Sequence, residues 1–419
     1  MKNENDKSAD SKRILIYGIN YAPELTGIGK YTGEMGAWLA RQGHKVEVIT
    51  ALPYYPDWEI HKSYKGKWWF TEIIEGVKVH RCPLYVPKNV TSLKRIFHEF
   101  SFLAGLFPIW FVTLFQKRFD VVFCISPPFH IAILPLIYAK IRGVKFINHI
   151  QDLQLDAAKD LGMITNKHFL RLMFAVEKAI YDKGTHVSTI SEGMQQKIRE
   201  KGIDNEKVFL FPNWVDSVVV RPLSIEHSLR KEMGINYEDK VIMYSGNLGE
   251  KQGLEMIIEV AELYKHRKDI HFIISGSGGG KEKLMRITKE AKLSNVKFFP
   301  LQPFENLSAL LAIADIHLVL QKKSVSDLVM PSKLTSILAA AGCVIVTALP
   351  GTTLHNIISC HEMGILIEPE SKAALAEGIE LALNSNINIL RNNARKYAEK
   401  YLGKNAIIEN FEKNHLMHA

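Results

Sequence analysis

The sequence has few cysteines, and the four it has, Cys82, Cys124, Cys343 and Cys360, lie far apart. None belongs to a Cys-x-x-Cys pair, and no cluster of cysteine and histidine has the spacing of a zinc site. The pattern argues against a disulfide framework and against a zinc module. We therefore expect buried, reduced thiols and no bound metal.

An apolar run is missing from the first dozen residues, which are polar. A secretory signal needs such a run, so we expect a loose N-terminal tail on a chain that stays in the cytoplasm. A basic arm is missing as well, although 53 lysines and arginines exceed 44 aspartates and glutamates and give a formal charge of +9. The surplus is spread out, with denser spots at residues 61–67, 88–95 and 117–118. We expect no nucleic-acid partner, and phosphorylated small molecules or an anionic membrane surface instead.

Short β-rich runs alternate with amphipathic stretches along the chain, which predicts an α/β fold with parallel sheets covered by helices. The expected strands of the first half are residues 13–17, 45–50, 77–81, 121–125, 145–149, 186–189 and 209–211. Those of the second half are residues 241–245, 271–275, 296–299, 316–320, 344–347 and 364–367. The pattern fits two doubly wound units.

The length of 419 residues suits two domains of roughly 200 residues each. Two prolines and a loss of periodicity fall together near residues 212–222, where we expect the boundary. The expected domains are residues 1–215 and 216–390. Helices over residues 391–419 have no strand left to cover, so we expect them to pack across the junction.

Two loops of the first half have residues suited to binding a ligand. Residues 18–30 follow a strand and open a helix, where Gly27 and Gly29 let the backbone approach a ligand. Residues 148–156 end another strand, and His149 and Asp152 are candidates to orient a hydroxyl or transfer a proton. Each loop alone also fits a tight turn or a solvated strand end.

Three strand-to-helix loops of the second half have the composition of an anion site. Residues 245–255 combine small residues with Lys251, and residues 275–281 are rich in glycine. Residues 330–335 place Lys333 at a helix start, where a cation is unfavourable unless it meets an anion. Since ligands bind at this edge of an open α/β sheet, we expect a diphosphate held by backbone N–H groups, Lys251 and Lys333. Flexible turns and solvated lysines are the alternative.

Taken together, these residues resemble the family-4 retaining glycosyltransferases, which have the GT-B fold of two Rossmann-like domains facing across a cleft. The resemblance runs from about residue 13 to the C-terminus. It is carried by residues 21–29, 43–50, 188–191 and 211–216, the last similar to the family's interdomain Pro-Asn-x-Val-Asp element. Residues 246–254 and 331–334 are similar to a bacterial subgroup that builds O-antigen, capsule and colanic acid and includes N-acetyl-L-fucosamine transferases.

The resemblance implies a retaining transfer from a UDP-sugar to an undecaprenyl-diphosphate-linked saccharide, on the inner face of the bacterial cytoplasmic membrane and without a metal. The implied donor-binding residues are Gly246, Asn247, Lys251, Gln252, Gly278, Gly279, Ser332, Lys333, Leu334 and Thr335. The implied acceptor-binding residues are Glu24, Gly27, Gly29 and Gln151. The candidates for catalysis are Asp152, His149, Lys251 and Lys333.

The sequence departs from the family pattern at three places. Asn247 and Gln252 replace a common arginine and lysine, so Lys251 and Lys333 would supply the charge. A pair of glutamates eight residues apart is missing, and Asp327 can stand in for the first. The usual acceptor-side histidine falls at Gln151, which leaves Asp152 or His149 to act.

Residues 100–115 are uncharged and shorter than the ~20 residues of a membrane-spanning helix. They fit either a buried core helix or an interfacial anchor flanked by Lys94-Arg95 and Lys117-Arg118. Trp68 and Trp69 lie beside lysines in the same amphipathic manner. A sugar-nucleotide epimerase of the same fold and a non-catalytic GT-B scaffold are the alternative functions.

Overall fold

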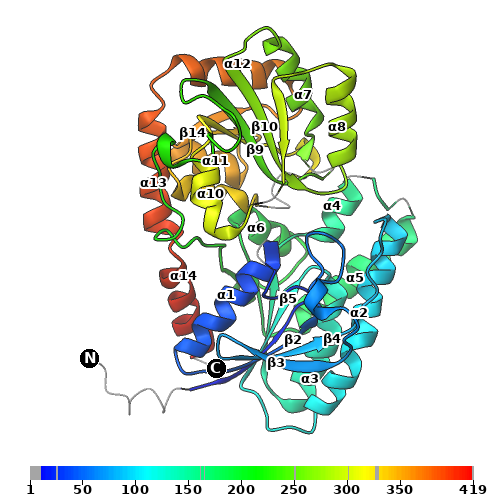
Figure 1. The fold of residues 1–419 in the computed structure, drawn as a ribbon. Helices are drawn as coiled ribbons and strands as arrows, with labels where there is room; N and C mark the ends of the chain where they lie inside the picture. Colours follow the sequence, from blue (N-terminus) through cyan, green and yellow to red (C-terminus); the bar gives the residue numbers. More distant parts are fainter. Residues whose placement is uncertain are drawn as a thin grey trace. The chain divides into compact units, whose positions relative to one another are not determined.

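The computed structural model describes residues 11–417 except 25–26, 161, 165, 250–251, 301 and 326–329. The chain forms two compact units (Figure 1). Unit 1 contains the chain up to Pro212 and again from Asn405, and unit 2 contains Asn213–Lys404. Each unit is described by itself.

Unit 1 is built on an eight-stranded sheet with the order β3-β4-β2-β1-β5-β6-β7-β8. Its strands are β1 (Arg13–Tyr17), β2 (Lys45–Ala51), β3 (Phe70–Ile74), β4 (Val77–Cys82), β5 (Val121–Ser126), β6 (Lys145–Ile150), β7 (His186–Thr189) and β8 (Val208–Leu210). All neighbours pair in parallel except β3, which pairs antiparallel with β4. Every strand expected in the first half is observed.

The edge strand β3 was not predicted. It joins β4 through a turn at Glu75 and Gly76, both with positive φ, which is the backbone of a tight hairpin. Glutamate at the first of these positions is unusual, because a positive φ favours Asn, Asp or Gly there. Only Gly76 is therefore typical of a hairpin turn, and the sequence did not indicate the hairpin.

Helices cover both faces of this sheet (Figure 1). The longer helices are α1 (Gly27–Arg41), α2 (Ser92–Thr113), α3 (Ile133–Arg142), α4 (Gln154–Asp160), α5 (Lys167–Lys183), α6 (Glu192–Glu200) and α14 (Lys404–Phe411). In Figure 1, α1 and α14 lie on one side of the sheet, and α2, α3 and α5 lie on the other. Strand β5 is buried at every position, as expected for a parallel strand covered on both faces.

Unit 2 is built on a six-stranded parallel sheet with the order β11-β10-β9-β12-β13-β14. Its strands are β9 (Lys240–Asn247), β10 (Ile270–Ser277), β11 (Val296–Phe299), β12 (Ile316–Val319), β13 (Val344–Thr347) and β14 (Gly364–Ile367). Its helices are α7 (Glu255–Ala261), α8 (Lys281–Glu290), α9 (Leu307–Leu311), α10 (Lys333–Ala339), α11 (Thr353–Cys360), α12 (Lys372–Asn384) and α13 (Asn388–Tyr401). The six expected strands are all present.

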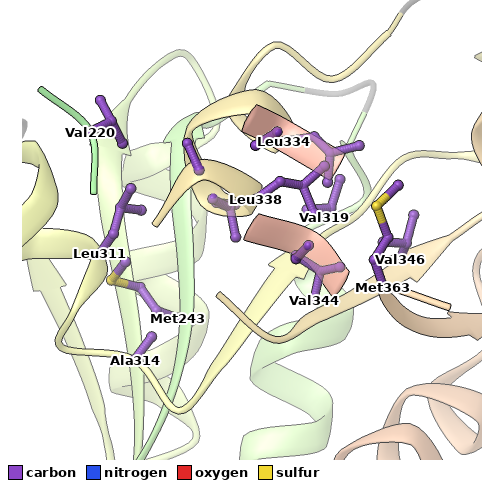
Figure 2. Packing of buried hydrophobic residues seen from close by; sticks show 14 of the residues in the cluster. Val220, Met243, Leu311, Ala314, Val319, Leu334, Leu338, Val344, Val346 and Met363 are labelled. Carbon is purple, nitrogen blue, oxygen red and sulfur yellow. The ribbon is translucent and has the colours of Figure 1, made fainter. Parts of the chain in front are cut away.

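Two hydrophobic clusters lie on opposite faces of this second sheet. Neighbouring residues of β9 alternate between them, with Met243 in one cluster and Ile242 in the other. Figure 2 shows the first cluster, in which Leu334 and Leu338 of α10 pack toward strand residues such as Val319. The start of α10 is therefore anchored by the core.

The C-terminal residues 391–419 belong to both units, because the chain up to Lys404 lies in unit 2 and the chain from Asn405 lies in unit 1. Ala394 and Ala398 of α13 lie in the core of unit 2. Phe411 of α14 stacks on Phe211 in unit 1, with 4.2 Å between ring centroids. The two helices separate because each buries its apolar face in a different core.

Helix α2 is longer than the uncharged run of residues 100–115, because it also includes Lys94 and Arg95. Among the described residues it is the one helix long and apolar enough to cross a membrane by length and composition, a test that core helices also pass. Phe102, Leu106 and Trp110 are buried on one side of the helix. Other aromatic residues of α2 are exposed, so the helix combines a core face with an apolar surface face.

Candidate functional site

The carboxyl ends of β9 and β10 stay paired beyond the hydrophobic core, with Gly276 opposite Gly246 and Ser277 opposite Asn247. A Cβ atom on Gly276 would overlap the carbonyl group of Gly246, and both glycines have positive φ. Only glycine lets two backbones approach this closely. The two glycine-rich loops therefore leave the sheet edge together.

Backbone hydrogen bonds hold these two loops against each other. The Leu248 amide donates to the Ser277 carbonyl at 2.8 Å, and the Gly280 amide donates to the Leu248 carbonyl at 2.8 Å. Gly278 has a φ of +145°, and an added Cβ would lie 2.6 Å from Asn247 Oδ1. Gly279, in contrast, borders open space on its Cβ side. The loops form a fixed rim with room above Gly279.

The side chain of Gln252 closes its own loop, because its Oε1 accepts a hydrogen bond from the Gly249 amide at 3.2 Å. In this arrangement Gln252 shapes the loop, and a direct contact with a ligand would need the amide nitrogen. Lys251, expected to supply positive charge here, lies outside the described residues, as does Asp327.

Lys333 lies beneath this rim. Its ammonium Nζ is buried and has no hydrogen-bond partner among the described residues. Nζ lies 3.3 Å from the centroid of the Tyr244 ring, and the side chain borders Gly246. Burial lowers the pKa of Lys333 well below its ordinary value. An unpaired buried cation is costly, which makes it a strong candidate for binding an anion.

The other residues of the Lys333 loop divide into core and surface. Leu334 is buried in the core, and the Thr335 hydroxyl donates to the Ser332 carbonyl at 2.9 Å. The Ser332 side chain does not cap α10. Ser332 has helical φ and ψ and makes no capping hydrogen bond, whereas a capping residue needs an extended backbone. Its exposed hydroxyl points to no described partner.

The first loop of unit 1 buries the carboxyl group of Glu24, which is 6% exposed. Its Oε1 accepts hydrogen bonds from the backbone amides of Tyr54 at 3.0 Å and Tyr55 at 2.9 Å. Its Oε2 has no partner among the described residues. Burial raises the pKa of Glu24 to about 7, against the opposing effect of the two amides. A Cβ on Gly29 would lie 2.8 Å from Oε2, so glycine is needed at this helix position.

Arg81 holds this loop in place and was missed in the sequence. Its guanidinium is fully buried and donates to the carbonyl groups of Ala22 and Ala51 and to Glu72 Oε1. These three bonds tie the loop after β1 to the end of β2 and to the edge strand. A single arginine within a strand pattern gives no signal of this role.

His149 lies in the interior of unit 1, stacked on Phe123 with 5.6 Å between ring centroids. Its Nδ1 is 2.9 Å from Ser188 Oγ, and its Nε2 is 2.8 Å from Gln151 Nε2. Burial lowers the pKa of His149 to about 3, so the ring is neutral near pH 7. Both ring nitrogens are engaged, and the geometry suits positioning Gln151 better than direct proton transfer.

Asp152 follows Gln151 at the carboxyl end of β6. Burial, followed by the charges of Glu24 and Asp152, raises the pKa of Tyr55. The structure therefore brings Glu24, Tyr55 and Asp152 into one electrostatic neighbourhood. Within the described part of the chain, no three His, Cys, Asp or Glu side chains come together to hold a metal ion.

Comparison with known proteins assigns both units. A family model for a glycosyl transferase 4-like domain matches residues 26–214, and a model for glycosyl transferases group 1 matches residues 226–401. The chain is 41% identical over 409 residues to the putative colanic acid biosynthesis glycosyl transferase WcaI of Escherichia coli. That alignment covers 95% of this chain and 98% of the relative.

Solved structures share the fold. Sucrose-phosphate synthase from Thermosynechococcus elongatus superposes with a TM-score of 0.75 at 15% identity, covering 97% of this chain and 99% of that chain. Anabaena HepE in complex with UDP-glucose gives a TM-score of 0.70 at 12% identity, covering 96% and 98%. At such identities the likeness concerns the fold alone, and it confirms the expected GT-B class.

The two neighbouring glycines of the second loop offer a matched test of its strained backbone. Gly278→Ala is expected to lower the free energy of unfolding of unit 2 by about 1–3 kcal/mol, because it strains φ and crowds Asn247. Gly279→Ala meets open space and should stay within about 0.5 kcal/mol of the wild type. Urea unfolding measures both, and equal effects would contradict the described loop geometry.

Proposed function

Because the chain belongs to the GT-B glycosyltransferases that combine a glycosyl transferase 4-like domain with a group 1 domain, we propose a specific transfer reaction for it. It moves a sugar from a UDP-sugar onto an undecaprenyl-diphosphate-linked saccharide. The relative named for colanic acid biosynthesis supports a surface polysaccharide as the product. The UDP-glucose in the HepE complex supports UDP as the carrier.

The donor sugar is proposed by similarity to the subgroup that the sequence resembles. That subgroup includes N-acetyl-L-fucosamine transferases, so an N-acetylated deoxysugar is the first donor to test. Membership in a transferase family favours transfer over the epimerase and the non-catalytic scaffold.

The observation that carries the chemistry is the buried ammonium of Lys333. When the bond between the sugar and the nucleoside diphosphate breaks, negative charge develops on the leaving phosphate oxygens. A preorganised cation in a site with little water stabilises this charge strongly. Lys333 lies beside Gly246 with no competing hydrogen-bond acceptor among the described residues. The backbone N–H groups of the glycine loops complete the proposed diphosphate site.

On the acceptor side, Asp152 is the proposed group that orients the attacking hydroxyl. The sequence left Asp152 and His149 as alternatives. We favour Asp152 because it is only half-buried, whereas the His149 ring is buried in the interior of unit 1. His149 then acts through Gln151, whose amide it orients at the strand end. The retained anomeric configuration and the lack of a metal requirement stay predictions.

Lys333→Met tests the donor site without removing the apolar part of the side chain. The substitution is expected to lower transfer activity by about 10²-fold or more. It should raise the free energy of unfolding by about 1 kcal/mol, because a buried amine without a hydrogen-bond partner is replaced by an apolar group. The readouts are sugar transfer from UDP-sugars and urea unfolding. The control is Lys265→Met, which alters an exposed lysine of the same unit. If Lys333→Met transfers sugar at a near-normal rate, Lys333 has no part in the mechanism.

Proton uptake gives a second readout of the same contact. In the free protein, burial lowers the pKa of Lys333, and a bound diphosphate would raise it by favouring the charged form. Binding then takes up a proton, so the affinity for UDP should fall as pH rises above the phosphate pKa of about 6 toward the ordinary lysine pKa of about 10.4. Calorimetry in buffers of different ionisation enthalpy measures the uptake, which Lys333→Met should abolish.

The exposed face of α2 is the proposed membrane contact. Its apolar side chains are Leu93, Phe97, Phe100, Phe107 and Phe111, with Phe115 just beyond the helix end. Phe97 is 73% exposed and Phe115 is 76% exposed, which is unusual for phenylalanine. Lys94-Arg95 and Lys117-Arg118 flank this stripe, and each cation near an anionic surface contributes about 1 kcal/mol. We infer a peripheral position on the inner leaflet, with the helix in the interface plane.

Vesicle flotation tests this position. The double variant Phe107→Glu, Phe111→Glu should lose binding to anionic vesicles at low salt, because it places two carboxylates on the apolar stripe. The control Leu263→Glu, Leu381→Glu alters two exposed leucines of unit 2 and should float like the wild type. A wild-type protein that ignores anionic vesicles would exclude the proposed contact.

A further inference from the structure

A groove of about 820 Å³ lies in unit 1 and borders the exposed stripe of α2, because Ala104 of the groove shares a helix face with Phe100 and Phe107. Its walls are residues 52–69, which follow β2, residues 83–88, which follow β4, and residues 101–105 of α2. The lining is mainly apolar and aromatic, with Trp58, Tyr64, Trp68, Trp69, Leu84 and Val86 among its members. Its volume is typical of sites for small molecules.

Hydrogen bonds and one close approach fix the walls of this groove. The Trp69 indole donates to the Gly105 carbonyl at 2.6 Å, and the Tyr85 amide donates to Ser101 Oγ at 2.8 Å. A Cβ on Gly105 would overlap the Pro83 carbonyl, so α2 meets this wall backbone to backbone. The groove is therefore formed without a ligand and needs little ordering to accept one.

The charged side chains of the groove are mostly cationic. Lys65, Lys67 and Lys88 line it together with a single carboxylate, Glu59, which pairs with Lys65 at 2.5 Å. Lys67 lies over the Phe70 ring, with its Nζ 4.9 Å from the centroid. This composition suits a ligand that has an apolar chain and a headgroup with more than one negative charge.

Tyr54 connects the groove to the first loop of unit 1, which contains Glu24. Its backbone amide donates to Glu24, and its ring contacts Trp58, a groove residue, at 5.6 Å between centroids. The Tyr54 ring also contacts His98, with 4.6 Å between centroids, and His98 contacts Trp58 in turn at 5.1 Å. A molecule held in the groove thus borders the loop that carries the buried carboxyl group.

We propose that this groove binds the isoprenoid chain of the lipid-linked acceptor next to its diphosphate, with the lysines holding the phosphates, an inference that rests on the proposed function. The aromatic walls would cover the first isoprene units, and the lysines would neutralise the diphosphate. A nucleotide sugar or a free saccharide fits less well, because few polar groups face the groove to satisfy its hydroxyls.

Farnesyl diphosphate, a water-soluble isoprenoid diphosphate, is the probe, and inorganic pyrophosphate is its comparison. Calorimetry without vesicles should show that farnesyl diphosphate binds at least about tenfold more tightly than pyrophosphate. The farnesyl chain needs to add only a modest favourable free energy of binding for a tenfold lower Kd. Equal affinities would show a phosphate site without a lipid groove and would overturn the proposal.

Ala104→Trp fills the groove from an exposed position of α2 and is expected to weaken farnesyl diphosphate binding at least about tenfold. Leu172→Glu, at an exposed leucine of α5 in unit 1 that does not line the groove, should leave this affinity unchanged. Circular dichroism and urea unfolding report that each variant remains folded. Wild-type affinity in Ala104→Trp would reject the groove as the binding site.

The outcomes separate the groove from the proposed function. If farnesyl diphosphate binds as expected but no lipid-linked saccharide is glycosylated, the groove stands and the proposed reaction fails. If lipid-linked acceptors are glycosylated at equal rates by the wild type and Ala104→Trp, the reaction stands and the groove is rejected.

Discussion

The backbone contact between Gly246 and Gly276 determines what unit 2 can do. It lets β9 and β10 extend past the core as a pair, so that their loops form one rim held by main-chain hydrogen bonds. Lys333 lies under that rim because Leu334, the next residue, is buried in the core and fixes the start of α10. The site therefore depends on packing that leaves the ammonium little freedom to move out into water. A buried cation without a partner costs stability, and such local violations are characteristic of functional sites.

Unit 1 repeats this principle with the opposite charge. Glu24 has one carboxyl oxygen bound by two amides and one without a described partner, and its pKa of about 7 follows from burial. Arg81 fixes the surrounding backbone through carbonyl groups and Glu72, not through Glu24 itself. The arginine thus supplies position, and its charge lowers the pKa of Glu24 by less than burial raises it. Each unit keeps a half-satisfied ionisable group at the carboxyl edge of its sheet, where a parallel α/β architecture exposes ligands to loop backbones.

The strands were predictable because their apolar runs are long and bounded by turns, and every expected strand is present. Edge strand β3 was not predicted from the sequence, because it is only half-buried and its turn begins with Glu75. The sequence placed Lys333 and Glu24 at strand ends, but burial and the lack of partners depend on tertiary packing that no local pattern encodes. For His149 the same packing decides between roles, since Ser188 contacts its ring from the neighbouring strand β7 and Gln151 contacts it from just beyond β6. The separation of α13 from α14 likewise depends on which core accepts Ala394 or Phe411.

The apolar surface of unit 1 has two parts with different shapes, and shape decides what each can contact. The α2 stripe is convex, so its phenylalanines can insert between many lipids but cannot enclose one chain. The groove is concave and already fixed by Trp69 and Gly105, so it can cover one chain but offers little area to a bilayer. An enzyme that draws its acceptor from a membrane needs both properties, because surface binding alone leaves the acceptor's diphosphate at an undefined height. Residues 101–105 and Phe107 belong to one helix, so the proposed membrane contact and the proposed lipid groove are held in a fixed relation by α2.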